Sequence, residues 1–322
     1  MRKEVKGLDV ESEKTEKKKL SNKSKIFIGI GIGLLTLLIA IVGILAKVYA
    51  DTKDTVEKVY EEIEQSELRV EVVKVEEKEP ISVLILGVDE RADDVGRSDT
   101  MIVLTINPNT NNTKMLSIPR DTRTEIVGYN TTDKINHAYA FGGIEMSRKT
   151  VENLLAIPID YVVQVNMDSF KNIVDIIGGI KIENELEFTN NGYHFPLGEI
   201  SLNGEEALVY VRMRYDDPDG DFGRQNRQKK VIQSIVKSAV SVEVALNYHA
   251  IFDTLGKNVK MNVSFDELTT IQKGYQDSVK NIEQLYMNSG QDQMIDDIYY
   301  YLPDEEEMEN LRATLKAHLG ME

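Results

Sequence analysis

Residues 81–123 read ISVLILGVDERADDVGRSDTMIVLTINPNTNNTKMLSIPRDTR, and this stretch decides the fold. Its two apolar runs, 81–86 and 101–106, are short, contain many β-branched residues and are bounded by turn residues, which predicts a pair of buried strands. A third run, 114–118, predicts a strand that ends at Pro119, because proline cannot donate a ladder hydrogen bond. These three segments predict strands of a β-sheet.

Charged residues stand at the ends of all three predicted strands: Asp89, Glu90, Arg91, Arg97, Asp99, Arg120, Asp121 and Arg123. Acids alternating with arginines at strand ends suit a site that holds a metal ion and a multiply charged anion. Arginine presents a planar fork that binds phosphate oxygens bidentately, so the anion we expect is a phosphate.

The composition of the chain excludes several classes of protein and of functional site. The 322 residues allow one large domain with appendages or two small ones, and the formal charge of −16 argues against a nucleic-acid-binding protein, which normally has a basic face. Nine of the 12 arginines nevertheless fall between residues 81 and 230, either as phosphate ligands or as scattered surface ion pairs. The absence of cysteine excludes disulfides, thiol chemistry and Cys-based zinc sites.

The first 80 residues have the composition of a membrane anchor and its flanks. Residues 1–25 are polar and lysine-rich, which predicts a disordered tail, and residues 26–46 carry no charge and are long enough for one transmembrane helix. The basic flank before this helix and the acidic stretch after it predict a cytoplasmic N-terminus and an extracytoplasmic domain. A cleavable signal peptide is the alternative, but the apolar run exceeds the usual length. Residues 47–80, rich in Glu and Lys, predict a solvated stalk.

The rest of the chain alternates predicted helices and strands. Residues 125–143 are predicted to be a loop followed by a helix. The next predicted elements are a helix at 146–155, a strand at 161–165, a helix at 170–177 capped by Ser169, and a strand at 181–187. They are followed by a helix at 202–214 capped by Asn203, an acidic loop at 216–223, a helix at 224–242, and a mainly helical region at 245–290 that contains a strand at 260–263. Residues 81–290 are therefore the predicted catalytic domain. The acidic residues 291–322 predict a solvated tail with a short final helix.

Asp89 and Asp99 are the best metal candidates. Mg²⁺ commonly takes one or two carboxylates together with substrate phosphates and water, and Mn²⁺ also favours oxygen ligands. The alternative is that Asp99 caps a turn and Asp89 merely ends a strand. The nearby arginines favour the metal site, because a metal ion and guanidinium groups together neutralise a pyrophosphate during phosphoryl transfer.

Other chemistries have weaker support. No Walker-type glycine loop and no G-x-S-x-G motif occurs, which disfavours nucleotide hydrolysis and serine-hydrolase chemistry. His137 and His194 could act as acid or base, but we interpret both as structural histidines. Arg212 and Arg214 would not share a helix face, whereas Arg224 and Arg227 would share one at the start of a helix, where anions bind favourably.

Seven motifs occur in order: LILGVDER, RSDTMIVLTINP, MLSIPRDT, DKINHAYAFGG, IDYVVQVNMDSF, IIGGI and LNGEEALVYVRMRYDDPDGDFGRQNRQ. Together they resemble the LytR-CpsA-Psr family of bacterial cell-envelope transferases over about residues 81–235. The resemblance implies an α/β (α-β-α) fold with a central mixed sheet flanked by helices. It also implies a phosphotransferase that moves a glycopolymer, such as wall teichoic acid or capsular polysaccharide, from undecaprenyl pyrophosphate in the membrane to peptidoglycan, forming a phosphodiester.

The same resemblance assigns roles by motif. Asp89 and Asp99 resemble the magnesium ligands of the family, and Asp221 resembles its acidic residue beside the arginines, a candidate base for the acceptor hydroxyl. The residues that resemble its catalytic and pyrophosphate-binding arginines are Arg97, Arg120, Arg212, Arg214, Arg224 and Arg227. Arg123 lies near a further basic position of the family, which makes it a candidate substrate-binding residue.

A polyprenyl chain needs an apolar slot between sheet and helices. The candidates for its wall are Val162, Val165, Phe170, Ile173, Val174, Ile177, Val231, Ile232 and Ile235. An ordinary closed core is the alternative for each of them. The sequence thus predicts a membrane-anchored, Mg²⁺-dependent transferase of a Gram-positive-type envelope. The alternatives are a polyprenyl-pyrophosphate hydrolase with the same site and a non-catalytic polyprenyl-phosphate-binding regulator.

Overall fold

The computed structural model describes Lys53, Glu57 and residues 59–89, 96–213, 217–239 and 259–321, all within one compact unit, Asp51–Glu322. The predicted tail at 1–25 and membrane helix at 26–46 lie outside these residues. Within the described ranges, no helix has the length and apolar character needed to cross a membrane.

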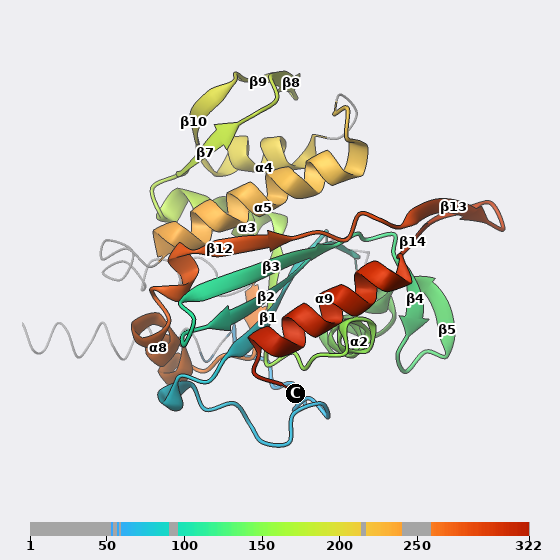
Figure 1. The fold of residues 1–322 in the computed structure, drawn as a ribbon. Helices are drawn as coiled ribbons and strands as arrows, with labels where there is room; N and C mark the ends of the chain where they lie inside the picture. The colour runs from blue at the N-terminus through green and yellow to red at the C-terminus, as the bar shows by residue number, and fades with distance from the viewer. Residues whose placement is uncertain are drawn as a thin grey trace, which may run out of the picture. The chain divides into compact units, whose positions relative to one another are not determined.

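A six-stranded mixed sheet forms the centre of the fold, in the order β11-β6-β1-β2-β3-β12 (Figure 1). The three strands predicted first, β1 (Ile81–Val88), β2 (Ser98–Asn107) and β3 (Asn112–Ile118), are confirmed. The structure shows that they form an antiparallel meander. Next to β1 lies β6 (Tyr161–Asn166), which is parallel to it. The edge strands are β11 (Val259–Met261), antiparallel to β6, and β12 (Ile282–Leu285), parallel to β3.

Helices cover both faces of this sheet, as the alternation along β2 requires. Met101 and Val103 belong to one buried cluster, and Ile102 and Leu104 to another, because successive side chains of a strand point to opposite faces. The first face packs against α2 (His137–Leu155) and α9 (Glu305–His318). On the other side Figure 1 shows α3 (Met167–Ile176), α4 (Gly204–Arg212) and α5 (Gly220–Ala239) grouped together, and α8 (Phe265–Gly274) near the sheet edge. The predicted mixed α/β architecture is confirmed.

Several local predictions need correction. Residues 123–134 form a hairpin of β4 (Arg123–Ile126) and β5 (Thr131–Lys134), not a loop. The strand predicted at 181–187 is the shorter β7 (Ile180–Asn184), and three further short strands follow it: β8 (Phe188–Asn190), β9 (Tyr193–Phe195) and β10 (Gly198–Leu202). They pack over α4, where the rings of Phe188, Phe195 and Tyr210 meet.

Helix caps explain where α3 and α4 begin. Ser169 is not the cap of α3: the Oδ1 of Asn166 accepts the Ser169 N–H at 2.9 Å, so the helix starts three residues earlier than predicted. Asn203 caps α4 as predicted, in a reciprocal capping box with Glu206. The long helix α5 begins at Gly220, which places Arg224 in its second turn and not at its N-terminus.

The C-terminal residues are part of the core, so the predicted solvated tail is wrong. Two strands, β13 (Gln291–Ile295) and β14 (Ile298–Leu302), form a hairpin, and α9 follows. Met308, Leu311 and Leu315 lie on one face of α9 at helical spacing and are buried against the sheet. Three of the acidic residues that suggested a tail, Glu305, Glu306 and Glu307, occupy the first turn of α9, where the helix dipole favours them.

The predicted solvated stalk also requires correction from Val59 onward. Val59 and Val75 are buried in the cluster on the second face of the sheet, the latter within a short 3₁₀ turn, η1 (Val75–Glu77). Arg69 donates to both carboxylate oxygens of Asp160, at 2.8 and 2.9 Å. This part of the chain therefore belongs to the folded domain.

Candidate functional site

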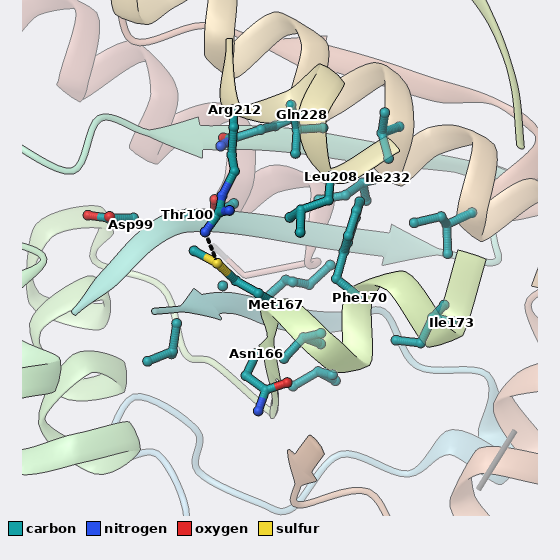
Figure 2. Close-up of a pocket in the computed structure, with 18 of the residues that line it drawn as sticks. Asp99, Thr100, Asn166, Met167, Phe170, Ile173, Leu208, Arg212, Gln228 and Ile232 are labelled. Atoms are coloured by element: carbon teal, nitrogen blue, oxygen red, sulfur yellow. Dashed lines mark hydrogen bonds between the residues drawn. The ribbon is translucent and has the colours of Figure 1, made fainter. Parts of the chain in front are cut away.

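An apolar cavity of about 430 Å³ lies between the sheet and helices α3, α4 and α5 (Figure 2). Its apolar wall consists of Val83, Ile85 and Val88 of β1, Val163 and Val165 of β6, Phe170 and Ile173 of α3, Leu208 and Val211 of α4, and Val231, Ile232, Ile235 and Val236 of α5. Figure 2 shows Phe170, Ile173 and Ile232 toward one end and Asp99 at the other. One end of this apolar space is therefore charged.

The sequence predicted part of this wall. Val165, Phe170, Ile173, Val231, Ile232 and Ile235 line the cavity. Val162, Val174 and Ile177 are not among its lining residues. Val162 and Val174 are buried in two different hydrophobic clusters, and Ile177 is partly buried against the second of them.

A second, polar cavity of about 310 Å³ lies where the strands end. Its lining residues are Asp89, Gly96, Arg97, Asp99, Arg120, Asp121, Lys134, Asn136 and His137. Asp89 and Asp99 line both cavities, so the apolar and the polar space meet at these two residues.

The backbone brings Asp89 and Asp99 together. Both of their N–H groups donate to the carbonyl oxygen of Arg97, at 3.3 Å from Asp89 and 3.1 Å from Asp99. The antiparallel ladder between β1 and β2 shifts register just before, between Gly87 and Val88. A Cβ at Gly87 would lie 2.9 Å from the Cβ of Thr100, so the close approach of the two strands here requires glycine.

Arg120 is oriented by two carboxylates at the boundary of the polar cavity. Its Nη1 donates to Asp99 Oδ1 at 2.9 Å, and its Nε lies 3.5 Å from Asp121 Oδ2. Arg97 lines the same cavity, while Arg212 and Arg224 line the apolar one. Figure 2 shows the Arg212 side chain reaching Met167, to which it donates a hydrogen bond.

Two of the other predicted arginines, Arg123 and Arg227, are described by the structure and line neither cavity. Arg227 is buried, pairs with Asp217 and donates to the backbone carbonyls of Tyr210 and Met213. Arg123 lies over the Tyr300 ring, 5.7 Å from its centroid. Arg214 and the side chain of Asp221 lie outside the described part of the chain.

Sequence reasoning undervalued the segment 133–137, which supplies three residues of the polar cavity. The Nζ of Lys134 lies 2.7 Å from Asp121 Oδ1, and His137 Nδ1 lies 2.7 Å from Asp133 Oδ2. The Oδ1 of Asn136 is buried without a hydrogen-bond partner among the described residues, as is the hydroxyl of Ser98 next to Asp99. Buried polar atoms left without partners suggest a ligand at this place.

A metal ion would depend on few protein ligands here. In the described ranges, no group of three or more His, Cys, Asp or Glu residues is arranged to hold one. Two carboxylates that face one space still fit Mg²⁺, because this ion usually completes its shell with substrate phosphates and water.

A family model described as the LytR_cpsA_psr family matches residues 44–317. The chain belongs to this family. It is 48% identical over 265 residues to the polyisoprenyl-teichoic acid–peptidoglycan teichoic acid transferase TagU of Bacillus subtilis (strain 168), covering 82% of this chain and 86% of the relative.

Solved structures of the LytR_cpsA_psr relatives have the same fold. The crystal structure of B. subtilis TagU has a TM-score of 0.62 at 45% identity and covers 75% of this chain and 97% of that one. A structure described as TagT bound to LIIa-WTA has a TM-score of 0.69 at 32% identity, covering 80% and 97%. The resemblance inferred from seven motifs is thereby confirmed.

Proposed function

We propose that this protein is an extracytoplasmic, Mg²⁺-dependent phosphotransferase that moves an anionic glycopolymer, wall teichoic acid or a similar polymer, from undecaprenyl pyrophosphate to peptidoglycan. The observation that carries the proposal is the meeting of an apolar and a polar cavity at Asp89 and Asp99. A polyprenyl pyrophosphate has the same two-part character, an apolar chain that ends in a doubly phosphorylated head. The names of the relatives, teichoic acid transferases that act on a polyisoprenyl-linked substrate, support it.

The apolar cavity would hold the first isoprene units of the carrier. Its walls are aliphatic and aromatic side chains of five different elements, and burying isoprene surface there yields about 25 cal/mol per Å². With the predicted membrane helix at 26–46 anchoring the domain, the lipid would reach this cavity from the bilayer in which it resides.

The pyrophosphate head would lie at the junction of the two cavities. Arg97 and Arg120 would bind its oxygens, with Arg212 and Arg224 on the side of the lipid. Asp89 and Asp99 would hold Mg²⁺, or Mn²⁺, which would neutralise charge on the phosphates. The phosphodiester would form when an acceptor sugar hydroxyl attacks the phosphorus that bears the glycopolymer, and undecaprenyl phosphate would leave.

A transfer assay with a lipid-linked teichoic acid donor and uncrosslinked peptidoglycan tests this function. The wild-type protein should release one polyprenyl phosphate for each glycan attached. Asp99→Asn should reduce this transfer by about 10²–10³-fold, the usual effect of losing one electrostatic group at such a site. The control Asp277→Asn removes an exposed carboxylate that pairs with Lys280 and lines neither cavity, and it should leave transfer unchanged.

The same assay separates the alternatives by product. Lipid phosphate released without glycan attachment would identify a hydrolase. Tight binding of polyprenyl phosphate without turnover would identify a non-catalytic regulator. Either result would contradict the proposed transfer.

A further inference from the structure

The side chain of His137 combines two features that a purely structural histidine does not need. It lines the polar cavity together with Arg97, Asp99 and Arg120, and its Nδ1 lies 2.7 Å from Asp133 Oδ2. Its other ring nitrogen, Nε2, has no hydrogen-bond partner among the described residues, and 23% of the side chain is exposed. One nitrogen is thus fixed by a carboxylate while the other remains available to a ligand in the cavity.

The carboxylate that orients His137 is itself held in place. Asp133 Oδ1 accepts the backbone N–H of Lys134 at 2.8 Å and the Tyr300 hydroxyl at 3.1 Å. Burial alone would raise the pKa of the Asp133 carboxyl, but the hydrogen bonds from His137 and from these two donors outweigh burial and lower that pKa below its ordinary value. Asp133 therefore stays ionised and favours the tautomer of His137 that carries its proton on Nδ1.

We infer that His137 is the general base that accepts the proton of the acceptor sugar hydroxyl. This inference rests on the proposed transfer and names the residue that activates its nucleophile. A carboxylate that orients one imidazole nitrogen while the other receives a hydroxyl proton is the arrangement by which many enzymes activate oxygen nucleophiles. Imidazole suits the task because it exchanges a proton near neutral pH.

The other acids of the polar cavity are less suited to this role. Asp99 accepts a hydrogen bond from Arg120, and Asp121 lies 2.7 Å from the Lys134 ammonium. Each of these two carboxylates is already paired with a cation of the protein, and taking up a proton would disrupt that pair. Asp89 faces the metal position proposed above. His137 is the remaining group of the described lining that can take up a proton.

The surface beside His137 suits a sugar ring. Tyr129 and Phe141 stack with ring centroids 4.2 Å apart and are 52% and 38% exposed. The Phe141 ring centre lies 5.9 Å from that of His137. The helix is broken directly after Phe141, where Gly143 has a φ of +64°. An acceptor sugar packed on the exposed side of this aromatic pair would lie next to His137.

The acceptor oxygen forms a bond to the phosphorus that bears the glycopolymer, and its proton moves to Nε2 of His137. The bond between that phosphorus and the bridging oxygen of the pyrophosphate breaks, and polyprenyl phosphate leaves with the electron pair. His137 then returns the proton to solvent, which restores the neutral imidazole.

The test compares His137→Ala and His137→Gln with the wild type for transfer rate, donor binding and thermal unfolding. Transfer should fall by about 10²–10⁴-fold, as expected for loss of a general base, while the donor Kd stays within about twofold. Added imidazole should restore part of the His137→Ala rate. The control His194→Ala removes an exposed histidine on β9 and should change none of these quantities.

The pH profile provides a readout that a structural role would not change. The charged and titratable groups around His137 are Asp133 and Lys134 of β5, Tyr300 of β14, and Asp89, Arg97, Asp99, Arg120 and Asp121 of the cavity. Because His137→Gln removes the group that accepts the proton, the dependence of its kcat on pH should differ in shape from that of the wild type. Asp133→Asn should lower kcat without weakening donor binding, because Asp133 only positions His137.

Two results would overturn the inference while leaving the proposed function in place. One is transfer by both His137 variants within about threefold of the wild type. The other is a loss of transfer that imidazole does not restore in a folded variant, which would give His137 a structural role. A wild-type protein without any transfer activity would instead contradict the proposed function.

Discussion

At the residue scale, the arginines near the site fall into two groups that differ in the residues with which they pair. Arg120 contacts Asp99 and Asp121 at the boundary of a cavity, whereas Arg227 is enclosed by Asp217 and two backbone carbonyls that join α4 to α5. Both came from motifs of the same family, and the sequence contains nothing that distinguishes them. Only the tertiary structure shows that Arg120 lines a cavity whereas Arg227 is buried in the protein interior.

Replacing these two arginines should have opposite effects. Arg227→Ala leaves the buried carboxylate of Asp217 uncompensated and should lower the free energy of unfolding by about 3–5 kcal/mol. Arg120→Ala should change it by less than about 1 kcal/mol, since this side chain lies at a cavity surface, but should abolish donor binding. Urea unfolding and donor titration measure the two effects. A stable Arg227→Ala variant that has lost donor binding would contradict this distinction.

Strand-end reasoning from the sequence located Asp89, Arg97, Asp99 and Arg120, because neighbouring strands bring their ends together. It could not locate His137, whose place in the cavity depends on the hairpin of β4 and β5 and on the start of α2. The strands β4 and β5 are short, and neither they nor the first turn of α2 show an apolar periodicity. Their positions therefore depend on how they pack onto the rest of the fold.

At the element scale, the accuracy of prediction followed the strength of the local pattern. The meander β1-β2-β3 has apolar runs that are rich in β-branched residues and bounded by turns, and its three strands were predicted at nearly the positions that the structure shows. Asn166 and Ser169 are both good helix caps three residues apart, and the sequence alone does not choose between them. The composition of α9 does not indicate that this helix packs on the sheet. Acidic residues dominate its first turn, while the apolar residues that contact the sheet are distributed along the helix.

His318, at the end of α9, forms hydrogen bonds with residues of two sheet strands, β2 and β3. Its Nδ1 lies 2.7 Å from the Thr105 hydroxyl, and its Nε2 lies 2.8 Å from Asn112 Oδ1. Burial lowers its pKa to about 4, with smaller effects from Lys114 and Glu283. The imidazole is therefore neutral in the folded protein at physiological pH.

This burial makes stability depend on pH. In the unfolded chain a histidine binds its proton below about pH 6.5, whereas in the folded chain His318 binds one only near pH 4. Between these values the unfolded state holds more protons, so stability is complete above pH 6.5 and falls as the pH decreases, by a total on the order of 3 kcal/mol. His318→Gln should lack this component. Chemical unfolding of both proteins at several pH values measures it, and a pH-independent difference would contradict the assignment.

At the scale of the whole molecule, the fold leaves an open space between its central layer and one helical layer. The sequence identified the apolar residues of that layer but not which of them face a cavity, because lining and core use the same residue types. Val165 lines the cavity and Val162, on the same strand, is in the core. Packing density is a property of the assembled layers and does not appear in a linear pattern.

A substitution in the apolar cavity should weaken binding of the lipid chain without affecting binding of the pyrophosphate head in the polar cavity. Ile235→Trp, on α5, would fill part of the apolar space and should weaken binding of a long-chain polyprenyl donor by about tenfold or more. Inorganic pyrophosphate, which lacks the chain, should bind equally well. The matched control Ile235→Met nearly conserves volume and should retain the affinity for the donor. Equal affinity of Ile235→Trp for the long-chain donor would show that the chain lies elsewhere.

The most direct measurement is a crystal structure with a polyprenyl pyrophosphate and Mg²⁺. The isoprene chain should lie between the sheet and helices α3 and α5, with the two phosphates beside Asp89, Asp99 and Arg120. A lipid seated on another surface, or phosphates bound away from these carboxylates, would contradict the claim that the two cavities together form one substrate site.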